Sequence, residues 1–480
     1  MIFSSVTFAV FFCIVAGCIL CTQLPFVVQR FSPSMLLKVR HAILLAASYV
    51  FYGWWDWRFC FLMLTVTSIA YISARNINKP FFRVFGIVTP LVVLGIFKYF
   101  NFFLDSFGVL VGISRLGSLN IILPVGISFY TFQAMSYTLD VAMGRLEATS
   151  FMDLALYIAF FPQLVAGPIV KAGDFLPQLK ENRLITFKNC EKGMQIFLFG
   201  LAKKIVVADH LAVFVDSVFA TPLAYHSATI VLAVVSYSIQ IYLDFSGYSD
   251  MAIGAALCFG YEFEQNFNMP YIAKDVSEFW KRWHISLSSF LQQYLYIPLG
   301  GNRHGTIRTY ANLIITMVLG GLWHGANWTF VVWGTLHGVA LCVHRVFRSM
   351  SWKAKPSRLN DALSMVATYT FVCICWIFFR AETLEDAVVI LGRVFSWSEG
   401  IVHPYIWSWV AMALVGGATF IAMRKFEPSV DARGREILVS GFCPVMDLTK
   451  ISSLTVFLFS WGVVLGLMYT GGSPFIYFQF

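Results

Sequence analysis

Residues 320–338 read GGLWHGANWTFVVWGTLHG, an apolar and aromatic stretch that nevertheless contains two histidines, His324 and His337. The stretch has no acidic residue to balance a charged imidazole. An ionisable side chain inside a membrane is costly and usually marks a functional site or pathway. The stretch therefore predicts a membrane segment that carries a buried polar site.

Composition extends the membrane prediction to the whole chain. Of 480 residues, 58% are hydrophobic and 12% are charged, whereas soluble domains average about 25% charged residues. Crossing a bilayer takes about 20 apolar residues. The sequence predicts an all-α polytopic protein of about 11–13 membrane segments, forming one integral domain over residues 1–480. The predicted segments are 3–28, 41–56, 59–74, 84–98, 121–140, 151–169, 193–216, 228–260, 309–322, 326–344, 360–379, 403–423 and 452–472.

The charge pattern indicates topology and not a nucleic-acid surface. The net charge is +9, and the basic residues stand in short clusters between apolar segments. Such clusters mark cytoplasmic loops. The first apolar run is followed by Arg30 and has no basic residue before it, which favours a retained span over a secretory signal. The ten cysteines lie mostly inside apolar stretches, so neither a zinc site nor a disulfide framework is indicated.

Two segments depart from simple spans. Residues 151–169 contain FFPQLVAGP, whose prolines and glycine interrupt a helix, and basic residues flank both ends. The run 310–322 has 13 residues, about 20 Å of helix, which is too short to cross the bilayer core. The turn at Trp323-His324-Gly325 is therefore predicted at membrane depth. Irregular backbone is tolerated there only inside protein or beside a wet cavity, so we expect His324 to face an internal cavity.

A further stretch, 275–299, reads DVSEFWKRWHISLSSFLQQYLYIPL. Phe279, Trp283 and Leu287 follow helical spacing beside basic residues, which predicts an amphipathic helix at the cytoplasmic interface. The stretch includes His284. A helix that only lies on the membrane surface explains the pattern equally well.

Among the polar residues, His324 is the strongest candidate for chemistry. An imidazole with a pKa of about 6.5 is suited to accept a proton at neutral pH. His337 lies 13 residues later and, on a continuous helix, about 140° round from His324, so a metal-binding pair is not expected. Asp244 either lines the same cavity or locks helices together, and locking is favoured. Gln163 could supply a polar contact from the FPQLVAGP break, although loop geometry alone explains its position equally well.

The nucleophile and nucleotide motifs that would suggest other enzymes are missing. The chain has no GxSxG elbow, no Walker A motif and no histidine followed by an aspartate five residues later. A covalent serine intermediate is therefore not indicated. Direct transfer assisted by a base is favoured if the chain is an enzyme.

Six ordered motifs resemble the membrane-bound O-acyltransferase (MBOAT) family, and in particular its bacterial branch, which includes the alginate O-acetyltransferases. They are LPVGISFYTFQAMSYTLDV, FPQLVAGPIV, DFSGYSDMAIG, NFNMPYIAKDVSEFWKRWHISLS, YLYIPLGGNRHGT and GGLWHGANWTFVVWGTLHG. The resemblance covers a core of about 95–345, with flanking helices over 1–94 and 360–472. It implies a helical fold with an internal tunnel or funnel through the membrane.

The resemblance also implies roles for single residues. His324 in LWHGANW matches the family's essential histidine, and His284 in FWKRWHISL matches a second histidine of bacterial members. Tentative contacts of the substrate or cavity are Trp280, Arg282, Trp283, Trp323, Asn327, Asp244 and Gln163. Gln292 and Gln293 stand where bacterial relatives commonly have an Arg-Asp pair, which leaves a salt bridge at this position unsupported.

The function implied by the resemblance is transfer of an acetyl group from a cytoplasmic thioester, acetyl-CoA, across the membrane. The acceptor pathway would use an exported SGNH-type acetyltransferase and O-acetylate an exopolysaccharide such as alginate. No bound cofactor and no metal are expected, and the location would be the bacterial cell membrane, the inner one in a Gram-negative cell. Two alternatives stay open: D-alanyl transfer to teichoic acid, as in a related branch, and a transporter that performs no chemistry.

Overall fold

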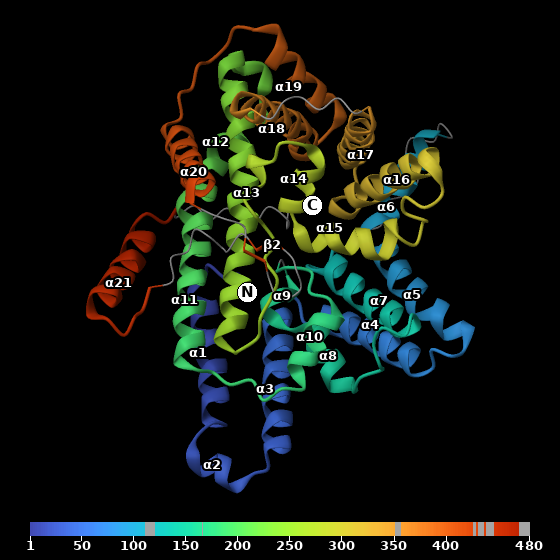
Figure 1. Ribbon diagram of the computed structural model, residues 1–480, viewed down its shortest axis with the longest axis vertical. Helices are drawn as coiled ribbons and strands as arrows, with labels where there is room; N and C mark the ends of the chain where they lie inside the picture. Colours follow the sequence, from blue (N-terminus) through green and yellow to red (C-terminus); the bar gives the residue numbers. More distant parts are fainter. Residues whose placement is uncertain are drawn as a thin grey trace. The chain divides into compact units, whose positions relative to one another are not determined.

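The computed structural model describes residues 1–110, 121–165, 167–350, 357–425, 429–430, 436–437 and 446–469 (Figure 1). Within these residues the named elements of regular secondary structure are helices, apart from two antiparallel strands of two residues each, β1 (Ser429–Val430) and β2 (Glu436–Ile437). The prediction of an all-α protein is confirmed. Ala166 of the FPQLVAGP break and the end of the predicted segment 452–472 lie outside the described residues.

The chain divides into two compact units. The first comprises Met1–Phe197 and Tyr248–Glu264, and the second comprises Leu198–Gly247 and Gln265–Phe480. One long helix, α13 (Ser227–Cys258), contributes residues to both. The single integral domain expected from the sequence stays a prediction.

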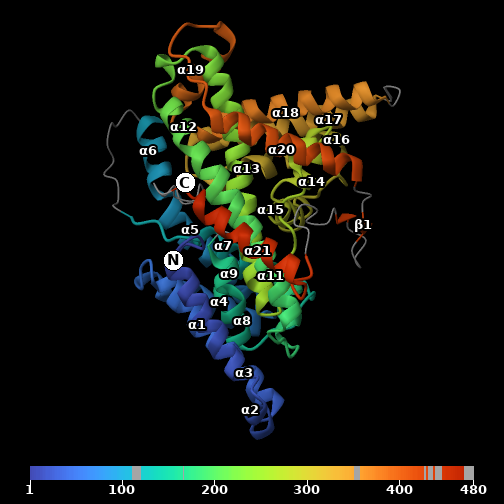
Figure 2. The same ribbon diagram turned by 90° about the vertical axis from the view of Figure 1, so that its left-hand side faces the viewer.

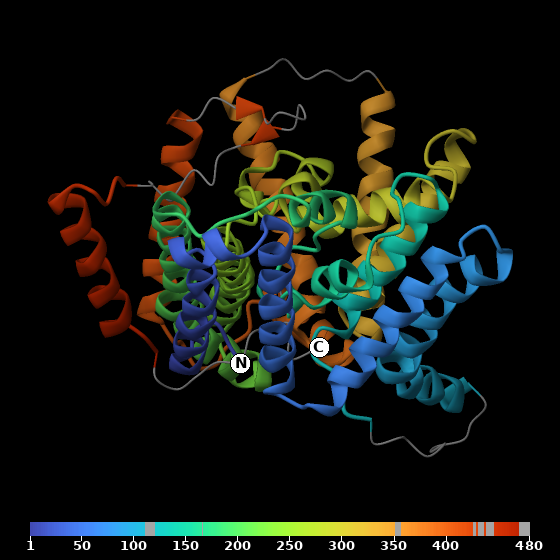
Figure 3. The ribbon, with the colours of Figure 1, turned by 90° about the horizontal axis from the view of Figure 1, so that it is seen from below.

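The first unit contains the helices that precede the candidate site in the sequence. Helices α1 and α3 run side by side in it, as the blue ribbons of Figure 3 show. Its elements are α1 (Val6–Cys21), α2 (Pro25–Arg30), α3 (Pro33–Gly53), α4 (Arg58–Arg75), α5 (Pro80–Leu94), η1 (Gly95–Tyr99), α6 (Phe100–Leu110), α7 (Ile127–Ala142), α8 (Phe151–Ala159), α9 (Phe161–Leu164), α10 (Ala172–Leu179) and most of α11 (Phe187–Ala202).

The second unit contains both histidine motifs. Helices α16, α17 and α18 are neighbours in it (Figure 2). Its remaining elements are η2 (Lys203–Ala208), α12 (Asp209–Ala220), η3 (Pro222–Ala224), η4 (Pro270–Ile272), α14 (Val276–Arg282), α15 (Ile285–Leu291), η5 (Gln292–Tyr296), α16 (Gly305–His324), α17 (Trp328–Ser349), α18 (Arg358–Arg380), α19 (Leu384–Ser396), α20 (Ile406–Lys425) and α21 (Ile451–Gly466).

Local sequence explains where several of these helices begin. Asp275 caps α14 by accepting a hydrogen bond of 2.8 Å from the backbone N–H of Glu278. Thr383 and Asp386 form a reciprocal capping box at the start of α19. Side-chain oxygens at these positions satisfy amides that a helix leaves without an internal partner. The second of these helices, α19, does not appear among the predicted segments because it is amphipathic and short.

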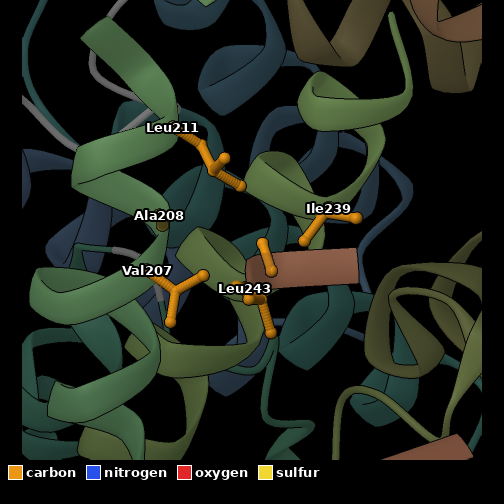
Figure 4. Packing of buried hydrophobic residues seen from close by; sticks show 6 residues of the cluster. Val207, Ala208, Leu211, Ile239 and Leu243 are labelled. Carbon is orange, nitrogen blue, oxygen red and sulfur yellow. The ribbon is translucent and has the colours of Figure 1, made fainter. Parts of the chain in front are cut away.

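An apolar cluster joins four helical elements of the second unit, η2, α12, α13 and α20. Val207, Ala208 and Leu211 pack against Ile239 and Leu243 of α13 (Figure 4). Ala411 of α20 belongs to the same cluster. Van der Waals packing of these side chains holds η2, α12, α13 and α20 together.

Five helices in the described part of the chain are long and apolar enough to cross a membrane. They are Pro33–Gly53, Pro80–Gly108, Ser227–Cys258, Trp328–Ser349 and Arg358–Arg380. Shorter apolar helices include Val6–Cys21 and Ile451–Gly466. The chain is therefore a multi-pass membrane protein, as the composition predicted.

The sequence underestimated the length of α16. The segment was predicted from residue 309 to residue 322, but the helix extends from Gly305 to His324 and has 20 residues. At 1.5 Å per residue it measures about 30 Å, which equals the thickness of a bilayer core. The sequence argument inferred the membrane depth of the His324 turn from a helix too short to cross the bilayer. That argument was wrong, because the polar residues before 309 are also helical.

Candidate functional site

His324 is the last residue of α16, and α17 begins after a short turn. The two helices approach to backbone contact because glycines face the partner helix. A Cβ added to Gly321 would lie 2.2 Å from the carbonyl oxygen of Phe330, and one added to Gly334 would lie 2.3 Å from that of Met317. Small residues at such contacts allow membrane helices to pack closely. The glycines of the motif thus fix where the imidazole at the end of α16 is held.

His284 lies between two short helices. The single amphipathic helix predicted over 275–299 is wrong, because the chain breaks between α14 and α15 and His284 adopts a left-handed backbone with φ of 44°. The apolar side chains of this stretch, Phe279, Trp283 and Leu287, are buried in protein. Their helical spacing reflects packing against other helices, which periodicity does not distinguish from contact with lipid.

The two candidate histidines meet inside the second unit. The ring centroids of His284 and His324 are 6.2 Å apart, and both side chains are buried, with 0% and 3% of their surface exposed. Trp323 lies 5.9 Å from the His284 ring. Trp333 and Phe379 each lie 5.2 Å from the His324 ring with their planes steeply inclined to it. Aromatic walls therefore surround both imidazoles.

His337 joins the same aromatic cluster from α17. Its ring lies 5.0 Å from Trp333, which also contacts His324. The indole N–H of Trp280 donates a 3.3 Å hydrogen bond to Nδ1 of His337. The helical-wheel separation of His324 and His337 does not apply, because the turn after α16 places them on different helices. Among the described residues no group of three or more His, Cys, Asp or Glu side chains is arranged to hold a metal ion.

Asn266 is a residue that the sequence analysis did not single out. Its side-chain oxygen lies 3.1 Å from Nδ1 of His284 and accepts hydrogen bonds from the backbone N–H and the hydroxyl of Ser286, at 3.2 and 2.9 Å. Asn266 and Ser286 are both buried. The asparagine stands in the NFNMPYI motif, 18 residues before the histidine, and only the folded chain brings the two together.

Trp283 and Arg282 have contacts that stabilise α14. Trp283 stacks on Phe279 at 5.7 Å and packs 4.9 Å from Trp376 of α18. Arg282 forms an ion pair of 2.7 Å with Glu278, one turn earlier. Neither residue has a ring contact or hydrogen bond to His284 or His324 among the interactions described for it, so their assignment to a substrate contact stays a prediction.

Asn327 caps α17. Its side-chain oxygen accepts from the backbone N–H of Thr329 at 3.1 Å, and its amide nitrogen donates to the carbonyl oxygen of Glu382 at 2.8 Å. These two bonds hold the turn that follows His324 and connect it to the segment before α19. A direct contact of Asn327 with substrate stays a prediction.

Asp244 and Gln163 lie in different units. Asp244 is buried in the second unit and forms an ion pair of 2.7 Å with Lys204, which pairs at the same distance with Asp209. The ion pairs connect α13 to η2 and α12, and a cavity-lining role of Asp244 stays a prediction. Gln163 is buried in the first unit, where its amide nitrogen donates to the carbonyl oxygen of Tyr157.

Burial determines the charge of His284. Removal from water disfavours an imidazolium, and burial lowers the pKa of His284 from 6.5 to about 3. The side chain is therefore a neutral imidazole at pH 7. A neutral imidazole has one nitrogen that donates a proton and one that accepts, which suits it to proton transfer.

Comparison with known proteins shows which family this chain resembles. Residues 126–382 match the membrane-bound O-acyltransferase (MBOAT) family. The probable alginate O-acetylase AlgI of Pseudomonas putida is 38% identical over 92% of this chain and 95% of its own length. The peptidoglycan O-acetyltransferase of Helicobacter pylori is 38% identical over 76% of this chain and 75% of its own length.

A more distant relative represents the related branch. The teichoic acid D-alanyltransferase of Bacillus subtilis is 27% identical over 55% of this chain and 70% of its own length. The matched residues 126–382 include His284, His324 and Asn266 together with the helices that carry them. The chain belongs to the membrane-bound O-acyltransferase family and is a bacterial multi-pass membrane O-acyltransferase.

Proposed function

We propose that this protein transfers an acetyl group from acetyl-CoA on the cytoplasmic side to the outer face of the membrane, for O-acetylation of an exopolysaccharide such as alginate. The observation that carries the proposal is the meeting of two buried imidazoles, His284 and His324, inside the family-matched region. The acetyl group is supported by the names of the Pseudomonas and Helicobacter relatives. These relatives are named for different acceptors, so alginate is the first candidate acceptor and peptidoglycan is the second.

The two rings are near enough to act on the same acceptor hydroxyl, because their centroids are 6.2 Å apart. The histidines take up or polarise the hydroxyl proton as the oxygen attacks the thioester carbonyl. The new C–O bond forms, the C–S bond breaks, and the proton passes to the CoA thiolate.

The acceptor hydroxyl belongs, in this proposal, to an exported SGNH-type acetyltransferase that delivers the group to the polysaccharide. The chain itself supplies the membrane step, and basic residues such as Arg303 and Arg308 are candidates for attracting the phosphates of the donor. Membership of the acyltransferase family favours an enzyme over a transporter that performs no chemistry.

The test uses purified full-length protein in nanodiscs with radiolabelled acetyl-CoA, with and without an SGNH-type partner. CoA release and acetyl transfer are compared for wild type, His324→Ala and His284→Ala. His304→Ala, an exposed histidine at the start of α16, is the matched control. Loss of transfer in both site variants with unchanged thermal unfolding supports the proposal. Equal activity in all four proteins contradicts it.

D-alanyl transfer is the second candidate, because a teichoic acid D-alanyltransferase is among the relatives. Its lower identity, 27% against 38%, favours acetyl transfer. A D-alanyl carrier protein offered in place of acetyl-CoA distinguishes the two. Activity with that donor alone would replace the acetyl proposal by the D-alanyl one.

A further inference from the structure

Two backbone hydrogen bonds connect the segment around Asn266 to the segment around His284. The N–H of Ile285 donates a 2.9 Å hydrogen bond to the carbonyl oxygen of Asn266, and the N–H of Asn268 donates at 2.8 Å to that of Arg282. The two segments therefore form a clamp that sets the distance between the Asn266 side chain and the imidazole. The positive φ of His284 is maintained by this surrounding structure, as strained backbone at functional sites usually is.

The hydrogen bonds around Asn266 identify which of its side-chain atoms faces His284. The atom receives the backbone N–H of Ser286 at 3.2 Å. A backbone N–H only donates, so the receiving atom is the amide oxygen and not the amide nitrogen. The hydroxyl of Ser286 donates to the same oxygen at 2.9 Å.

That oxygen in turn assigns the proton of the imidazole. Nδ1 of His284 lies 3.1 Å from the Asn266 oxygen, and an amide oxygen only accepts. Nδ1 must therefore carry the hydrogen. The other arrangement, in which the Ser286 hydroxyl donates to Nδ1 across 3.4 Å, would place two acceptors face to face. A neutral imidazole has one N–H, so Nε2 carries the lone pair.

We propose that Asn266 is a positioning residue that holds the proton of His284 on Nδ1, so that Nε2 serves as a proton acceptor in acyl transfer. The inference rests on the proposed function and deepens it. In this tautomer the neutral imidazole of His284 cannot donate a hydrogen bond to an oxyanion from Nε2, since that nitrogen has no hydrogen. His337 shows the opposite arrangement, because the Trp280 N–H donates to its Nδ1 and places its hydrogen on Nε2.

The proton balance of the step follows. The acceptor hydroxyl gives its proton to Nε2 of His284 while its oxygen forms the bond to the acyl carbon, and His324 polarises the same hydroxyl. The resulting imidazolium keeps its Nδ1–H bond to Asn266. When the C–S bond breaks, the proton moves from Nε2 to the leaving thiolate, and the imidazole returns to its starting tautomer.

An aspartate at this position would act differently from the asparagine. A neutral oxygen orients the ring without stabilising its charged form, whereas a carboxylate would favour the imidazolium. The Asn266→Asp protein should therefore keep the tautomer and raise the pKa of His284. The Asn266→Leu protein should lose the tautomer, and in serine proteases the wrong tautomer of the catalytic histidine costs about 10⁴-fold in kcat.

The experiment measures kcat and KM for acetyl-CoA against pH for wild type, Asn266→Leu and Asn266→Asp in nanodiscs. Asn268→Leu is the matched control, since the hydrogen bonds described for Asn268 involve its backbone N–H and carbonyl oxygen, which leucine keeps. We expect Asn266→Leu to lose at least tenfold in kcat with KM within about twofold. The aspartate variant should keep its activity at neutral pH, with its acid limb shifted upward by about 1 pH unit or more.

A second measurement does not depend on turnover. Nitrogen-15 NMR of histidine-labelled protein, with His284→Gln to assign the signal, reports which ring nitrogen carries the proton. An Nδ1–H signal in wild type that is lost in Asn266→Leu supports the inference even if that variant folds poorly in the activity assay. An Nε2–H signal in wild type overturns it. Equal losses of kcat at every pH for both Asn266 variants would also overturn the inference, because a merely structural role gives that result.

The two proposals fail in different ways. If wild type does not use acetyl-CoA while the Nδ1–H signal is present, the donor proposal fails and the positioning role of Asn266 stands. If wild type is active and the tautomer is the other one, the positioning inference fails alone.

Discussion

Replacing Gly321 by alanine should separate α16 from α17 and displace His324. The added Cβ would lie 2.2 Å from the carbonyl oxygen of Phe330, and real Cβ atoms essentially never approach an atom closer than 3.0 Å. The obstacle is backbone, which does not rotate away as a side chain does. The helices must therefore move apart by about 0.8 Å, the difference between these distances.

A shift of this size acts on both stability and rate. Overpacking of a tight contact costs about 1–3 kcal/mol. His324 follows Gly321 by three residues on the same helix, so its imidazole moves with the displaced backbone relative to Trp333. Misplacement of a reacting group by about 1 Å can cost about 100-fold in rate. We expect a lower melting temperature together with a loss of acyl transfer of that order.

The assay compares thermal unfolding in one detergent and acyl transfer for wild type, Gly321→Ala and Gly392→Ala. Gly392 is an exposed glycine within α19 that has no heavy atom within 4 Å of an added Cβ. The control should be neutral or slightly more stable, because alanine is favoured over glycine in a helix. A Gly321→Ala protein with the melting temperature and rate of wild type would refute the reasoning that this contact positions the imidazole.

Three further predictions concern the second unit. Lys204→Met removes the lysine that forms ion pairs with two buried carboxylates, Asp209 and Asp244. It should lower the free energy of unfolding by about 3–5 kcal/mol. The combination with Asp209→Asn and Asp244→Asn should regain most of it, as thermal unfolding in detergent will show. Burial lowers the pKa of His284 to about 3, so below about pH 6.5 the unfolded chain binds a proton there that the folded protein does not. Stability should therefore fall as pH drops from about 6.5 towards 3, with a contribution of up to about 1.4 kcal/mol per pH unit, and a melting curve of His284→Gln that declines as steeply as wild type contradicts this. Thr383→Ala removes the capping box of α19 and should cost about 1 kcal/mol; a Thr383→Ser protein with the same loss would show that the hydroxyl is not the cause.

Helices were predictable wherever hydropathy and length sufficed. The predicted segment 360–379 corresponds to α18 (Arg358–Arg380), and 228–260 corresponds to α13. The amphipathic helix α19 was missed because its pattern is that of a soluble helix. The break at His284 was also missed. Nothing in the local sequence WKRWHISL opposes a continuous helix, and the left-handed backbone at His284 is held by hydrogen bonds to a segment 18 residues earlier.

The sequence also predicted some properties of the candidate site and not others. His324 and His284 were identified from residue type, setting and family resemblance, and the structure brings their rings together. Asn327 and Arg282 were grouped with them by nearness in sequence, yet the contacts that the structure gives them cap a helix and form an ion pair. Nearness along the chain does not predict the direction of a side chain when a helix ends between two residues.

The sequence by itself determined that this is a helical membrane protein with two histidines in apolar surroundings and the ordered motifs of the O-acyltransferases. These properties follow from composition, hydropathy and local motifs, which need no knowledge of distant contacts. Only the tertiary structure decided which groups surround those histidines, which nitrogen of His284 carries the proton, and how closely α16 and α17 approach. Such properties depend on hydrogen bonds and steric contacts between residues far apart in sequence, and these contacts exist only once the chain has folded.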